Sequence, residues 1–279
     1  MNDVLVILPT YNEVDNLGPL VQRILAASDH ADILVVDDNS PDGTGRLATA
    51  LAGVSDRIFV LNRAGKSGLG DAYRAGFGWG LARGYDLLVE MDADGSHQPE
   101  QLPALLAAAG RVDVVLGSRW IAGGGAPNWA IRRALLSRAG SWYAGVALGL
   151  PIRDVTGGYR VFRAGALRAI DYETVEAQGY CFQIETVWRA MRAGLRVAEV
   201  PIVFVERTSG VSKMSGNIVT EAILRVTSWG ILGLPDRIRR AIARSRRERP
   251  GIVARDEIAA TRTPVHGGTA SAHSLNRRD

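Results

Sequence analysis

The sequence predicts an α/β protein whose core is a mostly parallel sheet with helices on both faces. Through the first half of the chain, short apolar runs rich in β-branched residues alternate with segments of helical periodicity, which is typical of strand–helix–strand units. Polar clusters follow several of these runs, where open α/β sheets bind their ligands. A basic, polar stretch ends the chain, so we expect one large domain followed by a tail.

Five runs in the first half are expected to form buried strands, because each is a short and nearly continuous apolar segment. These strands are expected at residues 4–8, 32–36, 57–61, 85–91 and 112–116. The segments between them carry the spacing of amphipathic helices, which are expected at about 14–27, 42–52, 70–83 and 99–109. Pro99 suits the first turn of the last of these helices.

The second half is less regular but still predicts helices and strands. Helices are expected at 128–148, 180–193 and 217–233, and strands within 153–163 and 195–205. A polar, glycine-containing loop is expected at 206–216. The helix at 217–233 has an amphipathic pattern, an Arg-rich helical stretch follows at 236–249, and the composition from Pro250 onward is typical of disorder.

The charge of the chain is unevenly distributed. Residues 237–279 hold eleven Arg and four acidic residues, a net charge of +7, while the whole chain carries only +4 and the remainder is therefore slightly acidic. A basic tail on a nearly neutral body favours an anionic membrane surface as partner and argues against nucleic acid.

The composition also restricts the compartment. No signal-peptide pattern is present and no run reaches the ~18–20 apolar residues of a membrane-spanning helix, so we expect a cytoplasmic chain without a membrane anchor of its own. The single cysteine, Cys181, excludes an intrachain disulfide. We expect Cys181 to be a small buried residue, since no activating histidine is evident beside it.

Two aspartates, Asp92 and Asp94, follow the fourth expected strand in the stretch VEMDADGSHQPE. A calcium loop of the EF-hand type would need glycine and glutamate where the chain has His97 and Pro103. The DxDG start also resembles that of haloacid-dehalogenase phosphatases, but no later GDxxxD motif follows. Taken alone, the tetrapeptide is most simply a turn in which aspartate accepts local hydrogen bonds.

Neighbouring clusters favour a fourth interpretation, a divalent metal bound to a nucleotide diphosphate. Two carboxylates can hold Mg²⁺ or Mn²⁺ and leave coordination positions for phosphate oxygens and water. Asp37 and Asp38 end the second strand, where a base or ribose would bind, and residues 9–14 lack the GxGxxG turn of dinucleotide-binding folds. Polar clusters after strands one, two, four and five are expected to meet at one edge of the sheet.

Seven motifs occur in an order that resembles glycosyltransferase family 2, and more closely the polyprenol-phosphate (dolichol-phosphate) mannose synthases within it. The motifs are PTYNE, VVDDNSPDGT, KSGLGDAYRAGF, MDADGSH, GSRW, DVTGGYRVFR and RTSGVSK, within residues 3–235. The resemblance implies a GT-A, Rossmann-like fold. It also implies inverting transfer of mannose from GDP-mannose to a polyprenyl monophosphate, with glucosyl transfer from UDP-glucose as the alternative.

The resemblance implies a division of the chain and its partners. A glycosyltransferase domain is expected at 1–235, with a nucleotide half at 1–120 and an acceptor half at 121–235, followed by a basic, partly disordered tail at 236–279. The amphipathic helix at 217–233 and the tail are expected to meet an anionic membrane from its cytoplasmic side. Some relatives have a separate membrane-anchor protein, which is a possible partner here. A non-catalytic nucleotide-sugar binding module is the rival class.

Residue roles on the donor side are also implied by the resemblance. The guanine or ribose pocket is expected to be lined by Pro9, Tyr11, Glu13, Val36 and Asp38. Asp92 and Asp94 are the implied metal ligands, and Ala93 is expected to contact the donor through its backbone. Where some relatives have a glutamine as a further metal ligand the chain has Ser96, so either Ser96 or water completes the metal shell.

The resemblance assigns the phosphate groups to basic residues. Arg119, Arg207 and Lys213 match positions that bind the donor diphosphate, and Arg133 matches the position that holds the acceptor phosphate. Together with Asp94, the residues Arg133, Arg207 and Lys213 are expected to carry catalysis through positioning and charge stabilisation.

Four further residues have two interpretations each. Glu185 lies where other family members place a base, but it is equally a helix-surface or supporting carboxylate. His97 is expected to form hydrogen bonds within its loop rather than to ligate the metal. Tyr159 and Arg160 either face the acceptor or pack in the core.

Overall fold

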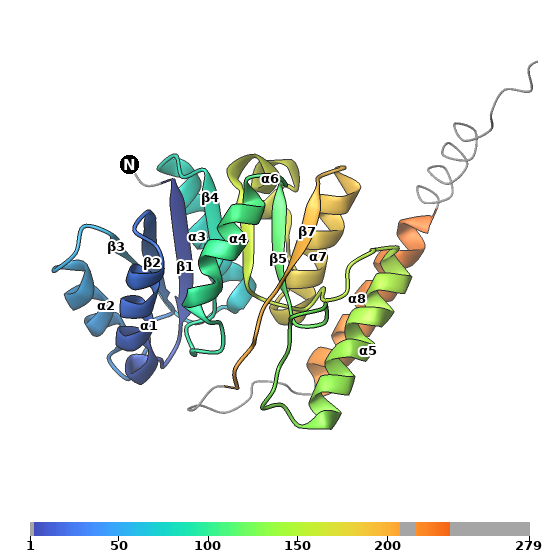
Figure 1. Cartoon of the computed structure of the whole chain (residues 1–279), viewed down its shortest axis with the longest axis horizontal. Coiled ribbons are helices and arrows are strands. Elements are labelled where there is room, and N and C mark those ends of the chain that lie inside the picture. The colour runs from blue at the N-terminus through green and yellow to red at the C-terminus, as the bar shows by residue number, and fades with distance from the viewer. Residues whose placement is uncertain (1–2, 207–215, 235–279) are drawn as a thin grey trace, which may run out of the picture. The chain divides into compact units, whose positions relative to one another are not determined.

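Strands of one mixed sheet form the centre of the computed structural model, which describes residues 3–206 and 216–234. Within these residues the sheet has the order β3-β2-β1-β4-β6-β5-β7 (Figure 1). The strands are β1 (Val4–Thr10), β2 (Ala31–Asp37), β3 (Ile58–Asn62), β4 (Leu87–Glu90), β5 (Val114–Ser118), β6 (Arg160–Arg163) and β7 (Val197–Pro201). All five strands expected in the first half are therefore present, each shifted by only a few residues.

Strand β6 is antiparallel to both of its neighbours, whereas the other strand pairs are parallel. It is inserted between β4 and β5, with Val161 opposite Val89 on one side and Val115 on the other. The sheet is thus mostly parallel, as expected, and the carboxyl ends of β1, β2, β4 and β5 lie at one edge.

Helices cover both faces of the sheet. They are α1 (Val14–Ala27), α2 (Thr44–Ala52), α3 (Leu69–Ala82), α4 (Leu102–Ala109), α5 (Ile131–Leu148), α6 (Ala164–Ala169), α7 (Gly179–Arg192) and α8 (Gly216–Leu232), with short 3-10 turns η1 (Pro99–Gln101) and η2 (Tyr172–Thr174). Alternate residues of β1 separate the two apolar layers: Leu5 and Ile7 pack with α3 and α7, while Val6 and Leu8 pack with α1 and α4. This alternation is the strand period of two.

Helix α3 lies very close to β1 because two of its residues have no side chain. A Cβ atom at Gly76 would lie 2.5 Å from Cγ2 of Ile7, and one at Gly80 would lie 2.8 Å from Cδ2 of Leu5. The repeated glycines of this segment are therefore explained by close helix–sheet packing.

Helix α8 packs against α5 and α7, as Figure 1 shows at the side of the sheet that carries β7. A Cβ atom at Gly230 would lie 2.7 Å from the carbonyl oxygen of Ala147, so the α5–α8 contact depends on this glycine. The Trp229 ring stacks on Trp188 of α7, with ring centroids 5.6 Å apart. The Trp229 ring therefore contributes to the contact between α7 and α8.

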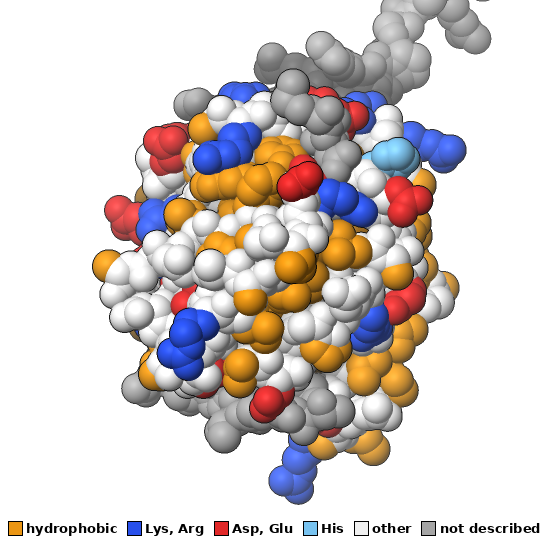
Figure 2. Space-filling model, turned by 90° about the vertical axis from the view of Figure 1, so that its left-hand side faces the viewer, with side chains coloured by type: hydrophobic (Ala, Val, Ile, Leu, Met, Phe, Trp, Pro, Cys, Tyr) orange, Lys and Arg blue, Asp and Glu red, His pale blue; other side chains and the backbone are white. Residues whose placement is uncertain are grey.

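Surface properties complete the description of the fold. On the side that carries α2 and β3, acidic and basic side chains are interspersed with hydrophobic ones (Figure 2), which is typical of a solvated surface. Among the described residues, every helix is too short or too polar to cross a bilayer. The expected tail at 236–279 lies outside the described residues.

Candidate active site

The candidate site lies beyond the carboxyl ends of β1, β2, β4 and β5. At the β1–β2 end, Thr10 and Ser40 both donate hydrogen bonds to Oδ1 of Asp37, at 2.9 and 2.6 Å. The backbone N–H of Ser40 donates to the other carboxylate oxygen at 3.0 Å. The buried carboxylate of Asp37 therefore links the end of β1 to the loop that follows β2.

Asp38, the next residue, pairs with a partner that the sequence analysis did not single out. Nη1 of Arg63 donates to Oδ1 of Asp38 at 2.6 Å. Burial raises the pKa of Asp38, and the charge and hydrogen bond of Arg63 offset this only in part. The register of β2 and β3, which sets Asp37 opposite Asn62, brings the two following residues together.

The other residues expected around a base or ribose lie at the same corner. Pro9 is the register partner of Val36, and Val36 is fully buried in the core, so it lies beneath this corner rather than on its surface. The ring of Tyr11 is half-buried and has Nζ of Lys66 4.1 Å from its centroid. Glu13 accepts a hydrogen bond from Nδ2 of Asn16 at 2.8 Å.

The aspartate pair occupies a tight turn directly after β4. Asp94 accepts the backbone N–H of Ser96 at 3.1 Å, and Gly95 between them has φ 76°, a conformation that suits glycine. Oδ1 of Asp92 accepts the hydroxyl of Tyr73 at 3.2 Å. The turn interpretation and the metal interpretation are thus compatible, because local hydrogen bonds shape a loop that presents two carboxylates.

Ala93 and Ser96 of this turn are buried, and His97 lies beneath it. The backbone N–H of Asp92 donates to Nδ1 of His97 at 3.0 Å, which confirms the expectation of a hydrogen-bonding role within the loop. Burial lowers the pKa of His97, although the negative charges of Asp92 and Asp94 act to raise it. Oγ of Ser96 is buried and has no hydrogen-bond partner among the described residues.

The residues of the turn fit a divalent cation. The Asp92 side chain is 32% exposed, and both carboxylates are hard oxygen ligands of the kind that Mg²⁺ and Mn²⁺ prefer. Within the described part of the chain, no group of three or more His, Cys, Asp or Glu side chains is arranged to hold a metal. A pair of carboxylates leaves coordination positions for phosphate oxygens and water.

Beneath the turn lies a buried charged layer. Glu90 and Arg160 are register partners on β4 and β6, and both are fully buried. Burial raises the pKa of Glu90 to about 7, although the charge of Arg160 opposes the change. Arg160 donates to the carbonyl oxygens of Gly157 and Val155, each at 2.8 Å. Arg160 and the buried Tyr159 therefore pack in the core rather than face an acceptor.

Arg119 is held by a buried carboxylate. Its Nε and Nη2 donate to the two oxygens of Asp154, each at 2.7 Å, and Nη2 also donates to Thr156 at 3.0 Å. Burial alone would raise the pKa of Asp154, but the hydrogen bonds and charge of Arg119 hold it below its usual value. The guanidinium also lies 5.2 Å from the Trp129 ring centroid.

Arg133 stands at the first turn of α5. Its guanidinium lies 4.0 Å from the ring centroid of Trp129, and Nη1 donates to Oε1 of Glu206 at 2.7 Å. Glu206 is the last residue described before the gap at 207–215, so Arg207 and Lys213 lie outside the described residues.

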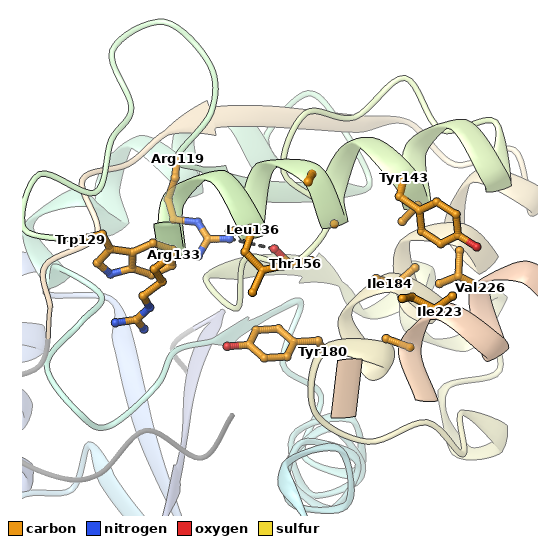
Figure 3. A pocket seen from close by; sticks show the side chains of 15 residues that line it. Arg119, Trp129, Arg133, Leu136, Tyr143, Thr156, Tyr180, Ile184, Ile223 and Val226 are labelled. Atoms are coloured by element: carbon orange, nitrogen blue, oxygen red, sulfur yellow. Dashed lines mark hydrogen bonds between the residues drawn. The ribbon is translucent and has the colours of Figure 1, made fainter. Parts of the chain in front are cut away.

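A cavity of about 310 Å³ is lined by residues of α5, α7 and α8. Figure 3 shows Arg119, Trp129 and Arg133 at one end and apolar side chains at the other. The lining includes Leu136, Ala139, Tyr143, Ala144, Tyr180, Ile184, Ile223 and Val226. The cavity thus has basic groups at one end and a long apolar wall.

The aspartate turn and the cavity are joined by aromatic rings. Phe204 lies 5.5 Å from His97 and 5.3 Å from Trp129, centroid to centroid. Phe204, Trp129 and Tyr73 could not be predicted as site residues, since scattered aromatic residues give no periodic signal in the sequence. Glu185, by contrast, is buried and paired with Arg189 at 2.6 Å, an arrangement that fits its supporting interpretation. Cys181 is buried, as expected.

Comparisons with known proteins agree with this geometry. Residues 5–171 match the model of glycosyl transferase family 2. The chain is 54% identical over 228 residues to an undecaprenyl-phosphate mannosyltransferase from Micrococcus luteus, covering 82% of this chain and 94% of that protein. It is 53% identical over 237 residues to a polyprenol monophosphomannose synthase from Mycolicibacterium smegmatis, covering 84% and 89%.

Solved structures share the fold at low sequence identity. A glucosyl-3-phosphoglycerate synthase from Mycobacterium tuberculosis, in complex with Mn²⁺, UDP-glucose and phosphoglyceric acid, has a TM-score of 0.59 and 19% identity, covering 81% of this chain and 79% of that one. A mannosyltransferase from Pyrobaculum calidifontis, in complex with GDP-Man and Mn²⁺, has a TM-score of 0.55 and 19% identity, covering 84% and 64%.

Proposed function

The chain belongs to glycosyltransferase family 2, and from that premise we propose that it transfers mannose from GDP-mannose to a polyprenyl monophosphate. The observation that carries the proposal is the connection between two features. A carboxylate pair suited to a metal lies at the strand ends, and aromatic contacts join it to an apolar cavity with Arg133 at its mouth. The two relatives that are more than half identical act on prenyl phosphates by name.

The cavity suits an amphipathic acceptor. A polyprenyl phosphate combines an anionic head with an apolar chain, and the cavity combines the guanidinium of Arg133 with the apolar wall of α5, α7 and α8. The head would displace Glu206 from Arg133 and gain a charge-assisted hydrogen bond. The first isoprene units would lie along Leu136, Ile184 and Ile223.

The reaction follows from this placement. An oxygen of the acceptor phosphate, which is anionic at neutral pH, attacks C1 of the mannose; the bond between C1 and the diphosphate oxygen breaks, and its electron pair leaves with GDP. Attack from the side opposite the leaving group inverts the anomeric centre. Holding both partners in line is the main contribution of the protein. No separate base is required.

The donor side is assigned to the strand-end residues. Pro9, Tyr11, Glu13 and Asp38 are proposed to hold the nucleoside, with the buried Val36 supporting them from the core. Asp92 and Asp94 would hold Mg²⁺ or Mn²⁺, with Ala93 touching the donor through its backbone. Such an ion supplies a Lewis acid that stabilises charge on the departing diphosphate. The diphosphate is further assigned to Arg119, Arg207 and Lys213, although the side chain of Arg119 is already engaged with Asp154.

The proposal is tested by a donor screen. With Mn²⁺ and a short polyprenyl phosphate, GDP-mannose is expected to give a kcat/KM about 100-fold or more above that of UDP-glucose, because a site that hydrogen-bonds its base rejects a mismatched one. Radiolabelled sugar recovered in the lipid phase measures the transfer. Preference for UDP-glucose would support the glucosyl alternative, and binding of GDP-mannose without transfer to any acceptor would support a binding module.

Membrane association is proposed from the outer surface of α5 and α8. These helices expose large apolar side chains, namely Ile131, Leu135, Trp142 and Val146 on α5 and Leu224, Ile231 and Leu232 on α8. Such a surface suits the interface of a bilayer, and the acceptor lies in one. The basic tail at 236–279 is proposed to add attraction to anionic lipids on the cytoplasmic face; a separate membrane-anchor protein stays a prediction.

Replacing one exposed apolar residue tests this surface. Trp142→Glu, at a residue that is 71% exposed, is expected to weaken binding to anionic vesicles by about tenfold, because an interfacial tryptophan is replaced by a charge. Vesicle co-sedimentation measures the change. Val54→Glu is the matched control, since Val54 is 83% exposed and follows α2. Equal losses in both variants would contradict the assignment to α5.

A further inference from the structure

We propose that His97 is a positioning residue that fixes the metal ligand Asp92 through a hydrogen bond to its backbone. The inference rests on the proposed function, because it assigns Asp92 to the metal. His97 itself is expected to touch neither the metal nor the sugar donor. It would act by holding Asp92 in the conformation in which a cation can bind.

The two nitrogens of the His97 ring both face Asp92. Nδ1 accepts the backbone N–H of Asp92 at 3.0 Å, so the ring hydrogen must reside on Nε2 when the imidazole is neutral. Nε2 lies 4.0 Å from Oδ2 of Asp92. The backbone N–H of Asp92 is thus hydrogen-bonded to the ring, while its carboxylate lies near the ring at a distance too long for a hydrogen bond.

The other carboxylate oxygen of Asp92 is held independently. Oδ1 accepts the hydroxyl of Tyr73, which is fully buried on α3. Asp92 therefore has three neighbours. The hydroxyl of Tyr73 donates to Oδ1, Nε2 of His97 lies near Oδ2, and Nδ1 of His97 accepts the backbone N–H. These contacts limit both the main chain and the side-chain torsions of Asp92.

The ring of His97 is itself fixed by packing. It is 1% exposed, stacks on Tyr159 with centroids 5.1 Å apart and meets the edge of Phe204 at 5.5 Å. A Cβ atom at Gly158 would lie 3.4 Å from Cε1 of His97 and 3.5 Å from Oδ2 of Asp92. The absence of a side chain at Gly158 thus leaves space for the His97 ring and the Asp92 carboxylate.

Fixing a ligand in advance strengthens metal binding, because less conformational freedom is lost when the ion arrives. Removing hydrogen bonds to groups that hold a metal typically weakens its affinity by about 10- to 100-fold. The same logic applies to Asp94, whose carboxylate accepts the N–H of Ser96 within the turn. His97 therefore restrains Asp92 through a hydrogen bond, as the backbone N–H of Ser96 restrains Asp94.

Two substitutions separate the hydrogen bond from simple packing. His97→Asn places its amide oxygen near the position of Nδ1, where it can still accept the N–H of Asp92. His97→Gln places its amide near Nε2 and leaves that N–H without its acceptor. Both side chains are polar and smaller than histidine, so a purely packing role predicts similar effects. Tyr159→Phe, which keeps the stacked ring, is the control.

The measurement is binding of Mn²⁺ to the full chain in the presence of GDP, followed by the electron paramagnetic resonance signal of free Mn²⁺. We expect His97→Gln to weaken Mn²⁺ binding by about 10-fold or more, His97→Asn to stay within a few-fold of the parent protein, and Tyr159→Phe to be unchanged. GDP affinity in EDTA should be equal in all four proteins, which shows that the folded nucleotide corner is intact.

Several outcomes would overturn the inference. Mn²⁺ binding that is unchanged in His97→Gln, or equally weakened in both His97 variants, would show that the hydrogen bond to Asp92 does not position the ligand. If His97→Gln does not fold, a tenfold loss in His97→Asn would still contradict it. Failure of the parent protein to bind Mn²⁺ with GDP would instead refute the proposed function.

Discussion

Asp94→Asn is expected to reduce the rate of mannose transfer by about 1,000-fold at saturating Mn²⁺. The carboxylate charge is lost, and a metal Lewis acid is worth several kcal/mol of transition-state stabilisation, with about 4 kcal/mol corresponding to this factor. The asparagine oxygen can still accept the N–H of Ser96, which Asp94 accepts at 3.1 Å, so the turn should persist. Initial rates with GDP-mannose and a short polyprenyl phosphate measure the effect, and the thermal midpoint reports on folding.

A nearby charge provides the control for Asp94. Glu100 is exposed and pairs with Arg23 at 2.7 Å, outside the turn. Glu100→Gln removes one negative charge from the same region and is expected to leave the transfer rate within twofold of the parent protein. Parent-like turnover in Asp94→Asn would remove Asp94 from the metal site, and equal losses in both variants would point to a general effect of charge.

Arg119→Met is expected to lower the free energy of unfolding by about 3–5 kcal/mol. The substitution leaves Asp154 buried without its cation, and breaking a buried pair from one side has an effect of this size. The Arg119 and Asp154 side chains are 5% and 0% exposed, and their atoms meet at 2.7 Å. Urea denaturation at neutral pH measures the change.

An exposed pair of equal length is the control for Arg119. Arg23 and Glu100 also meet at 2.7 Å, but their side chains are 39% and 59% exposed, so Arg23→Met is expected to change stability by only about 0–1 kcal/mol. Equal effects in both variants would contradict the role of burial. If Arg119 also contacts the donor diphosphate, as proposed, the folded variant should in addition show a raised KM for GDP-mannose.

The pH dependence of this pair has a definite sign. The pKa of Asp154 is lowered in the folded protein, so unfolding raises its proton affinity. The stabilisation is therefore fully present above the unfolded-state pKa of aspartate, about 3.9, and is lost as pH falls toward the lower folded-state value. Arg119→Met should accordingly flatten the acid limb of the stability profile.

The fold was predictable where the chain alternates regularly. Buried strands such as β1 and β2 are continuous apolar runs, and that signal depends only on local sequence. The position of β6 was not predictable in the same way, because its insertion between β4 and β5 depends on pairing between segments far apart in the chain. The short helix α6 was missed, since six residues of mixed composition carry little periodicity.

The motif residues of the candidate site could be predicted from the sequence. The order of the motifs pointed to Asp92, Asp94 and Arg133, and the end of β4 explains why the two aspartates lie at the edge of the sheet. The partners of these residues could not be read from the sequence. Glu206 beside Arg133 is a contact made by tertiary packing alone, while Arg63 beside Asp38 follows from a strand register that the sequence does not specify.

The order of strands has a consequence for synthesis on the ribosome. Strands β1, β2 and β3 have all their sheet partners within the first ninety residues, and β4 waits for one neighbour, β6. Both neighbours of β5 in the sheet, β6 and β7, come later in the chain. The apolar β5 segment must therefore leave the exit tunnel with both edges unpaired, a state that invites association with other nascent chains. Residues 114–118 are accordingly the segment that we expect to benefit from a chaperone until both β6 and β7 have been translated.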